Sequence, residues 1–510
     1  MSGEQHLDAA RELARNGSID DAYRIADLYL KQDPNDAAFL TVMTYIMLAS
    51  DKPPLAYHLA KRCTDLTPKD PSVWVNMGQA SQDLWLSKEA ERAYKRGLKV
   101  VKDARKMGYE GEDLDDQELY LLVNLCALYL DIGRFEEAEP WAKQCLELRP
   151  DHRKALANLG FCQLAQRNWK EGWKNYHQCL GHDWRPANHY GEEPEWDGKK
   201  AGKVVLYAEQ GLGDVLSFAS MVPDAQKRAK IILDVNPSIA PLLQRSFPEA
   251  SVYGTRMAKT LNWAEEDRDI DASLSIGQVG EFFRTKDSDF PGTPYLTPDP
   301  DRSFMWRELF KKKGKPVIGI AWSGGIPKTA SKYRQLGLEQ LLPVFKSVDA
   351  HFVSLQYKSA AKEIAEFKAD HPEVDLVEYA SASITTDYDD TAAMVSAMDH
   401  LVIMQTSVGH LAGGLGVPCW TFVPMTSQWR YGEHGEDYVW ANSVRLIRQK
   451  ERGKWDDVIE QTGVELSALF PRVSKAAGKT TQKGKLRGNR PKIRKNGRSS
   501  HGYDGDRSSA

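Results

Sequence analysis

A repeat of about 34 residues in the first third of the chain restricts the possible fold more than any other feature of the sequence. Helical segments close at prolines, and the first two, Pro34 and Pro68, lie one such period apart, with a third at Pro150. A helix-turn-helix unit of this length buries its apolar face only against its neighbours, so several units must stack. The pattern therefore predicts a helical solenoid.

The aligned units share residues at fixed positions. In this frame they span 3–36, 37–70, 71–104, 119–152 and 153–186, with an insertion at 105–118 before the fourth. The second helix of each unit carries a small residue: Ala22, Ala56, Ala90, Ala138 and Gly172. Expected aromatic positions hold Tyr94, Tyr129 and Tyr176. The pattern resembles the tetratricopeptide repeat (TPR), which implies a concave groove for a protein or peptide segment. A purely structural spacer is the alternative.

Composition limits the class of protein. At 510 residues the chain is too long for one core. No apolar run approaches the roughly 18 to 20 residues that cross a bilayer, and residues 1–17 are charged throughout, so we expect a cytoplasmic protein without a membrane span. The cysteines show no CxxC pairing and are expected to be reduced core residues: Cys63, Cys126, Cys145, Cys162, Cys179 and Cys419.

Beyond residue 186 the sequence changes character. Residues 187–200 are polar, lack periodicity and are predicted to be a linker. Short β-branched or aromatic runs then alternate with helical stretches, which is typical of a parallel α/β fold. These runs are 204–208, 231–235, 317–321, 351–355, 401–404 and 420–423. The proline-rich break at 291–300 separates two groups of strands, so we expect two Rossmann-like halves, 201–298 and 299–470, facing a cleft.

The stretch 401–420 is the first candidate site. Its apolar start predicts a buried strand that ends at Thr406 and Ser407, where a Gly- and Ala-rich helix begins. Free N–H groups and the positive end of the helix dipole suit a phosphate there, and His410 lies one turn further on. The alternative is an ordinary strand-helix-strand unit with tight packing.

A second candidate site follows the first strand of the α/β region, in the sequence YAEQGLGDVLSF. Gly211 and Gly213 permit a tight turn after Gln210. The turn lacks the third glycine of a dinucleotide fingerprint and places Asp214 at the start of a helix instead. A carboxylate at this place can take a proton from an attacking hydroxyl. Alternatively, Asp214 caps its own helix.

These motifs together resemble a known family. EQGLGDVLSF after PEWDGK, then GIAWSGG, FVSLQ and DTAAMVSAMDHLVIMQTSVGHLAGGLGVPCW, occur in the order seen in bacterial TPR proteins whose C-terminal part is similar to the family-9, heptosyltransferase-like glycosyltransferases. The resemblance covers about 195–450. It implies a GT-B architecture, a nucleotide-sugar co-substrate in the C-terminal half, an acceptor on the N-terminal half, no cofactor or required metal, and Asp214 as general base.

Further positions fit a nucleotide-sugar. Ser323 and Gly324 follow a strand and offer donors to phosphate, while Gln356 is a candidate for a base or ribose or else a surface residue. In the next loop we expect Lys332 or Arg334 to meet a diphosphate; two of the three cations there, Lys328 included, are expected to be only solvated.

One position departs from the family. Gln405 stands where the family commonly has aspartate before the threonine of the turn, so an amide replaces a carboxylate toward the sugar. The usual sugar specificity, or the activity itself, is then in question. Downstream, Trp429, Arg430 and Tyr431 either clamp a base or sugar, or cover the core while Arg430 pairs with Glu433.

The last residues, 471–510, are predicted to be a disordered basic tail. From Arg472 onward there are twelve Lys and Arg against two Asp, whereas the rest carries 56 basic against 69 acidic residues. Three hypotheses follow: a glycosyltransferase whose repeat groove selects the acceptor, a non-catalytic GT-B and repeat scaffold that binds nucleotide and protein partners, and a glycosyltransferase that acts on nucleic acid held nonspecifically by the tail.

Overall fold

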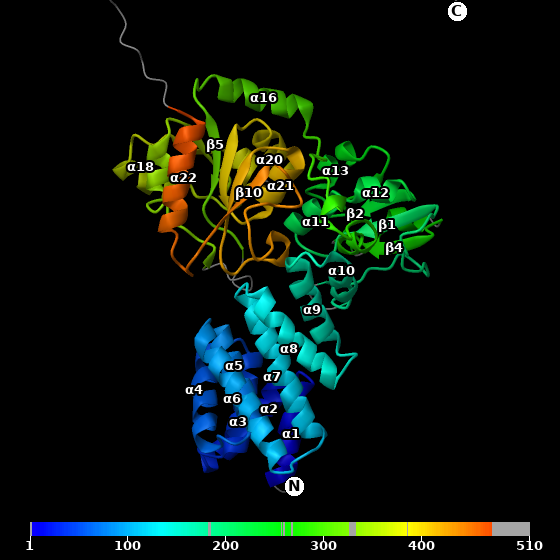
Figure 1. Ribbon diagram of the computed structural model, residues 1–510, viewed down its shortest axis with the longest axis vertical. Coiled ribbons are helices and arrows are strands. Elements are labelled where there is room, and N and C mark those ends of the chain that lie inside the picture. The colour runs from blue at the N-terminus through cyan, green and yellow to red at the C-terminus, as the bar shows by residue number, and fades with distance from the viewer. Residues whose placement is uncertain are drawn as a thin grey trace, which may run out of the picture. The chain divides into compact units, whose positions relative to one another are not determined.

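The computed structural model describes residues 3–181, 185–256, 258, 261–266, 269–325, 333–384 and 386–471. The chain up to Phe470 forms one compact unit by its internal contacts. Its helical repeats are coloured blue to cyan in Figure 1, the first α/β half green, and the second half green through yellow to orange. No helix among the described residues combines the length and apolar character that spanning a membrane requires.

Successive helix pairs build the N-terminal part, as the repeat predicts. The helices are α1 (Gly3–Arg15), α2 (Ile19–Gln32), α3 (Ala37–Ala49), α4 (Pro53–Leu66), α5 (Pro71–Asp83), α6 (Ser87–Lys106), α7 (Glu112–Asp131), α8 (Phe135–Leu148), α9 (Arg153–Ala165) and α10 (Trp169–His177). Asp36 and Asp70 cap the helices that follow them through their side chains. The small positions Ala22, Ala56 and Ala90 are fully buried, because each lies where two helices approach. The insertion lengthens α6 and α7, whose ends Arg105 ties together.

The first α/β half contains a parallel sheet. It consists of β1 (Lys203–Tyr207), α11 (Leu212–Ala219), α12 (Val222–Gln226), β2 (Lys230–Asp234), α13 (Ala240–Ser246), β3 (Ser251–Tyr253), α14 (Asn262–Glu266), β4 (Ala272–Ser275), η1 (Ile276–Gln278), α15 (Gly280–Phe283) and η2 (Asp287–Asp289). The strand order is β3-β2-β1-β4, and all these pairs are parallel.

The second half contains a wider parallel sheet. It consists of α16 (Pro300–Lys311), β5 (Val317–Ala321), α17 (Leu342–Ser347), β6 (His351–Ser354), α18 (Ala361–Asp370), β7 (Leu376–Glu378), α19 (Ala380–Ser383), α20 (Tyr388–Val395), β8 (His400–Met404), α21 (Ser407–Leu415), β9 (Cys419–Val423), η5 (Trp429–Tyr431), β10 (Val444–Arg448) and α22 (Asp456–Leu469). The order is β10-β9-β8-β5-β6-β7. This is the doubly wound Rossmann order, so the expected TPR solenoid followed by two Rossmann-like halves is confirmed.

Strand order determines where each half offers a site. In an open parallel sheet, ligands bind outside the carboxyl ends of the strands where the order reverses. In the first half the order reverses between β1 and β4, and the turn that carries Gly213 and Asp214 follows β1. In the second half the reversal lies between β5 and β8, which are followed by Ser323 and by Gln405. Both candidate sites thus lie at switch points.

The last repeat and the first half share one hydrophobic core. Trp173 of α10 is fully buried among the rings of Phe218, Trp429 and Trp440, and its indole N–H donates to the Arg284 carbonyl over 2.8 Å. Residues 187–200, predicted as a linker, contain neither helix nor strand. Trp196 from this segment is nevertheless buried in the same core, and its backbone N–H donates to the Ser273 carbonyl. The solenoid therefore continues into the α/β part through packed side chains.

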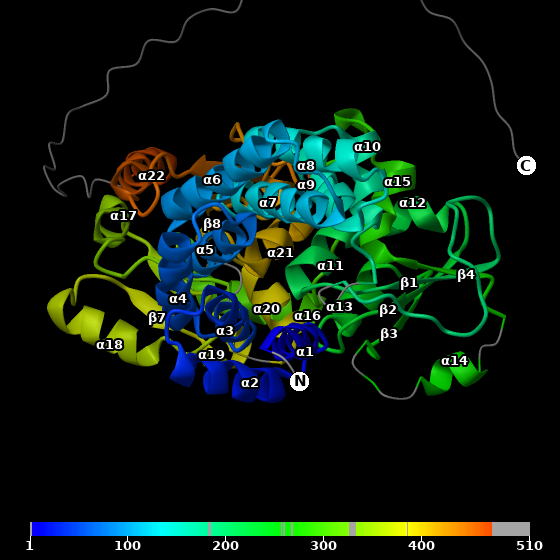
Figure 2. The same ribbon diagram turned by 90° about the horizontal axis from the view of Figure 1, so that it is seen from below.

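The two halves meet through α11 and α21, which lie side by side in Figures 1 and 2. Gly213 makes this approach possible, since a Cβ there would lie 2.9 Å from the His410 Cδ2 atom and 3.2 Å from the Ser407 Cα atom.

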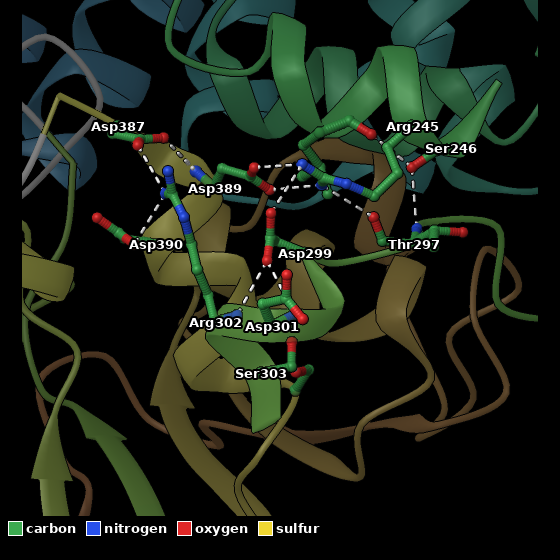
Figure 3. A network of polar contacts seen from close by, with 12 residues as sticks. Arg245, Ser246, Thr297, Asp299, Asp301, Arg302, Ser303, Asp387, Asp389 and Asp390 are labelled. Atoms are coloured by element: carbon green, nitrogen blue, oxygen red, sulfur yellow. Dashed lines mark hydrogen bonds and ion pairs between the residues drawn. The ribbon is translucent and has the colours of Figure 1, made fainter. Parts of the chain in front are cut away.

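A second contact between the halves is an ion network, drawn in Figure 3. Arg245 on α13 binds both carboxylate oxygens of Asp389 on α20, over 2.9 and 2.7 Å. Arg302 on α16 donates to Asp387 and Asp390, both over 2.8 Å. Asp387 caps α20 through its side chain, and Asp389 joins this helix to the first half; the Arg302 pairs lie within the second half.

Gly213→Ala is expected to lower the free energy of unfolding by about 1–3 kcal/mol, because the added methyl group must push α11 and α21 apart. Urea unfolding followed by circular dichroism measures this. Gly337→Ala is a matched control, since its Cβ would meet only Gln340 Oε1, at 3.9 Å. Equal stability of the two variants would contradict the close approach of the helices.

Candidate functional site

Asp214 is held by two partners at the start of α11. Its Oδ2 accepts a hydrogen bond from the Gly211 N–H over 3.0 Å, so the carboxylate does cap its helix. Its Oδ1 forms an ion pair with the Arg430 guanidinium. The Asp214 side chain keeps 18% of its surface exposed, against 3% for Arg430. The carboxylate is therefore both a cap and an accessible charged group.

Arg430, for which an ion pair with Glu433 was one of two alternatives, pairs instead with Asp214, and no ion pair among the described residues joins it to Glu433. The guanidinium lies 5.2 Å from the Trp429 ring and 5.6 Å from the Phe218 ring. Burial opposes its charge, but Asp214 and the neighbouring tyrosines outweigh this, so the pKa of Arg430 lies above its usual range. The signal in the sequence was an arginine between two aromatic residues, WRY, after a strand of the second half.

His410 is the centre of a buried hydroxyl network. Its Nδ1 lies 2.7 Å from Ser217 Oγ and 2.9 Å from the Tyr438 hydroxyl, and its Nε2 lies 3.1 Å from the Tyr431 hydroxyl. Burial, and then the charges of Arg430 and Arg334, hold the pKa of His410 well below its usual range. The imidazole is thus neutral, with both nitrogens engaged where α11 meets α21. His410 is expected from the sequence to face the donor phosphates; in the structure its two ring nitrogens contact the hydroxyls of Ser217, Tyr431 and Tyr438.

The residues predicted to bind the donor gather at the carboxyl ends of β5 and β8. Arg334 donates through Nη2 to the Gln405 carbonyl, and its own carbonyl accepts from the Gly324 N–H over 3.1 Å. Gln356 contacts Ser323 through both ends of its amide. A Cβ on Gly324 would collide with Thr406. Lys328 and Lys332 lie outside the described residues.

Several buried polar atoms in this group have no hydrogen-bond partner among the described residues. They are Arg334 Nε, Gln405 Nε2, Gln405 Oε1 and Thr406 Oγ1. Arg334 is 6% exposed and Gln405 only 1%. Burial lowers the pKa of Arg334, since among the described residues no carboxylate forms an ion pair with it. Buried polar groups in folded proteins are normally paired, so these unpaired atoms beside a cation are groups that a polar or anionic ligand would satisfy.

The turn before Asp214 is anchored to the last repeat. Gln210 donates through its amide to the Tyr176 hydroxyl over 2.7 Å and to Glu209 over 2.9 Å, and Arg256 donates to its carbonyl. Glu209 is itself paired with Arg185, and both side chains are fully buried. This anchoring was not visible in the sequence, because its members are far apart along the chain.

A cavity of about 360 Å³ joins Asp214 to the repeats. From the repeats it is lined by Ala127, Leu130, Asp131, Phe135, Asn158 and Phe161. From the α/β part it is lined by Gln210, Asp214, Ser427, Gln428, Trp429 and Arg430. The turn from Gln210 to Asp214 therefore opens toward the solenoid. A second cavity, of about 610 Å³, lies near α12 and residues 291–295 and contains none of the predicted site residues.

Metal ligands are sparse in the part of the chain that the structure describes. One group there, Glu136, Glu433 and His434, brings its ligand atoms within 4.8 Å of one another. Glu433 already accepts a hydrogen bond from the Glu136 backbone, and two of the three residues are exposed. All six cysteines are buried, which confirms their prediction as core residues.

Comparison with known proteins identifies the repeats. A family model described as tetratricopeptide repeat matches residues 120–152. Protein FlbA of Caulobacter vibrioides is 28% identical over 359 residues, which cover 66% of this chain; the match spans 59% of that relative, less than two thirds of its length.

Solved structures match over about a third of this chain. Pseudomonas aeruginosa PilF is 12% identical, with 37% of this chain and 78% of that chain covered and a TM-score of 0.30. A thermophilic TPR protein of Thermus thermophilus is 20% identical, with 36% and 92% covered and a TM-score of 0.28. The chain thus carries tetratricopeptide repeats, which form a protein-interaction scaffold.

Proposed function

We propose that this chain, with tetratricopeptide repeats ahead of two Rossmann-like halves, is a glycosyltransferase that moves a sugar from a nucleotide-sugar to a protein acceptor held by the repeats. The observation that carries the proposal is the cavity in which Asp214 and Arg430 meet the inner helices of the solenoid. An acceptor bound to the repeats has a direct route to Asp214, the one carboxylate that lines this cavity from the described α/β part.

In the proposed reaction Asp214 takes the proton of the acceptor hydroxyl. The oxygen then attacks the anomeric carbon of the sugar, and the bond from that carbon to the nucleoside diphosphate breaks. The leaving diphosphate carries negative charge, which Arg334 and the N-terminus of α21 at Thr406 and Ser407 are placed to stabilise. Arg430 orients Asp214 and is a further cation for the diphosphate.

Gln405 determines which sugars fit. Its amide has a free donor and a free acceptor and can hydrogen-bond sugar hydroxyls. Unlike the aspartate common in the resembling family, it carries no charge, and Arg334 beside it keeps its positive charge uncompensated by an ion pair among the described residues. The sugar position in this chain is therefore less acidic than in that family.

A second candidate function is a non-catalytic scaffold that binds nucleotide and protein partners. Two observations favour it: Gln405 in place of the aspartate, and the carboxylate of Asp214 already engaged by Arg430. In this case the nucleotide would bind without turnover.

Both candidate functions require nucleotide binding. A thermal-shift screen against ADP-, UDP-, GDP-, CMP- and dTDP-sugars and the free nucleotides tests whether the protein binds any of them. One nucleotide class is expected to stabilise the protein by about 2.7 kcal/mol at a hundred times its dissociation constant. Arg334→Gln should remove most of this shift. Arg149→Gln, which loses only a surface ion pair with Asp116, is the matched control.

A variant at His410 is unsuitable for this test. Its replacement by alanine would remove the hydrogen bonds to the hydroxyls of Ser217 and Tyr431 and change stability by itself. Transfer of labelled sugar from the stabilising donor to protein then distinguishes the enzyme from the scaffold. A cooperative melt that no nucleotide shifts would overturn both candidate functions.

A further inference from the structure

Helix α16 opens the second half and packs against it with one face. Phe310 on this face is buried, and the ring of Trp306 lies 5.1 Å from the ring of Tyr379. Ser303 accepts a hydrogen bond from Ser396, at the end of α20, over 2.9 Å. Spacings of three and four residues place Ser303, Trp306 and Phe310 on one side of the helix, and this side attaches α16 to the fold.

The opposite face of α16 carries apolar side chains in water. Phe304 is 60% exposed, Met305 70% and Leu309 37%, and Met305 is the most exposed of the large apolar side chains that the structure describes. Met305 and Leu309 are four residues apart and Phe304 adjoins Met305, so the three lie together. Figure 1 shows α16 on the outside of the second half. Exposed apolar side chains that lie together, rather than singly, indicate an interaction site.

A run of three lysines, Lys311–Lys313, follows this apolar face at the end of the helix, and all three are exposed. Lys311 lies 3.7 Å from Glu308, and in the described part of the chain no ion pair engages Lys312 or Lys313. Lys315, by contrast, is held by Asp375 over 3.0 Å. Basic residues at a helix C-terminus stabilise the helix dipole, but that role does not require apolar neighbours. The lysine run therefore gives the apolar face a cationic border.

Two carboxylates accompany this face. Asp301 lies in the first turn of α16, ten residues before Lys311, which is about 15 Å along a helix. Glu308 lies on the outward face itself and is the partner of Lys311. The charge near the lysine run is therefore still positive, because Lys312 and Lys313 exceed the single carboxylate beside them.

The combination of apolar and cationic groups decides between possible partners. A second copy of the chain is disfavoured, because three side chains offer far less than the roughly 800 Å² that each partner supplies in a stable dimer. A nucleic acid would use the lysines but leave Phe304 and Met305 in water. An anionic lipid surface satisfies both groups, since acyl chains take the apolar side chains and acidic headgroups take the lysines.

We propose that α16 and Lys311–Lys313 dock the protein on an anionic lipid surface, with Phe304, Met305 and Leu309 inserted at the boundary between headgroups and acyl chains. Lysine side chains suit this place, because their stems lie along apolar surface while their amines reach the headgroups. The attachment is peripheral and reversible, since three inserted side chains bury far less apolar area than a spanning helix. Docking goes beyond the proposed function and holds whether or not the chain transfers a sugar.

Co-sedimentation of the full chain with lipid vesicles tests the apolar part. Binding is expected with an equal mixture of phosphatidylcholine and phosphatidylglycerol, and little with phosphatidylcholine alone. Phe304→Ser/Met305→Ser/Leu309→Ser is expected to weaken binding to the anionic vesicles at least tenfold. Val464→Ser is the matched control, because Val464 on α22 is also an apolar side chain with 65% of its surface exposed.

The same assay tests the charged part. Replacing the lysine run by glutamine is expected to weaken binding to anionic vesicles at least tenfold, in the variant Lys311→Gln/Lys312→Gln/Lys313→Gln. The control removes three exposed lysines elsewhere in the second half and should bind as the parent does: Lys362→Gln/Lys450→Gln/Lys454→Gln. Residues 472–510, with their twelve Lys and Arg, are present in every variant and cannot produce the difference.

Insertion is measured directly with an environment-sensitive label. Met305→Cys is labelled with a nitrobenzoxadiazole (NBD) group, which reaches this site selectively because the six native cysteines are buried. NBD fluorescence is expected to rise several-fold when anionic vesicles are added, since the label leaves water for the acyl boundary. The same label at Val464→Cys should not respond.

Any of four results would overturn the proposal: no binding of the parent to anionic vesicles, parent-like binding by either triple variant of α16 and its lysine run, equal binding to both kinds of vesicle, or an NBD label at position 305 that stays in water. Sedimentation velocity without vesicles covers the remaining partner. A dimer that depends on Phe304 and Met305 would assign this face to a second copy instead.

Discussion

Asp214→Asn is expected to reduce sugar transfer by about 10²- to 10⁴-fold while nucleotide binding persists, because the amide cannot take the proton of the acceptor hydroxyl. Turnover with the donor identified by thermal shift measures the effect. Unchanged turnover would remove Asp214 from the mechanism.

The experiment must separate the loss of the proton acceptor from a loss of stability. Asp214 is the carboxylate that pairs with Arg430, whose side chain is 3% exposed. Removing one partner of a buried pair costs about 3–5 kcal/mol, so the variant is expected to be less stable as well as inactive. A loss of turnover alone would therefore not establish a chemical role.

A double variant resolves this. Asp214→Asn/Arg430→Met removes both charges and fills the space between the Trp429 and Phe218 rings with an apolar side chain. It is expected to regain most of the stability and none of the turnover. Recovery of turnover in the double variant would show that Asp214 acts only through the fold.

Arg185→Met is expected to lower the free energy of unfolding by about 3–5 kcal/mol. Arg185 and Glu209 are both fully buried, and Glu209 Oε2 has no partner among the described residues, so the remaining carboxylate would be buried without compensation. Arg185 also donates to Ser275 over 2.9 Å and to the Tyr176 carbonyl over 3.1 Å, and its guanidinium lies 4.1 Å from the Tyr176 ring.

Urea unfolding followed by tryptophan fluorescence reports this loss, because Trp173 and Trp196 lie in the shared core. Arg185→Met/Glu209→Gln, which leaves neither charge, should recover most of it. A single variant as stable as the parent would contradict the burial of the pair and, with it, the rigid connection between the repeats and the turn that carries Asp214.

The repeats and the principal strands could be predicted because their signals are local. An apolar face recurs with the period of a helix pair, and the small residues Ala22, Ala56 and Ala90 recur where helices approach closely. Each repeat unit can therefore be recognised from the residues of a single period. Buried parallel strands appear as continuous apolar runs, as in Val317–Ala321, where every residue is buried.

Four strands were missed: β3, β4, β7 and β10. Ser251–Tyr253 and Leu376–Glu378 have three residues each and lie at sheet edges, where only one neighbour and partial burial are required, so their sequences carry little apolar signal. Val444–Arg448, also at a sheet edge, mixes apolar and basic residues for the same reason. The strand order, which determines the switch points, therefore needed the structure.

By itself the sequence determined the repeat, the two Rossmann-like halves and the glycine turn before Asp214, because periodicity, burial and turn geometry act between residues that are close along the chain. Only the tertiary structure decided the partners: Arg430 with Asp214, Arg185 with Glu209, and Asn158 in the same cavity as Asp214. All three pairs join different parts of the fold. Charge pairing in a buried site depends on where folding places each side chain rather than on its neighbours in sequence.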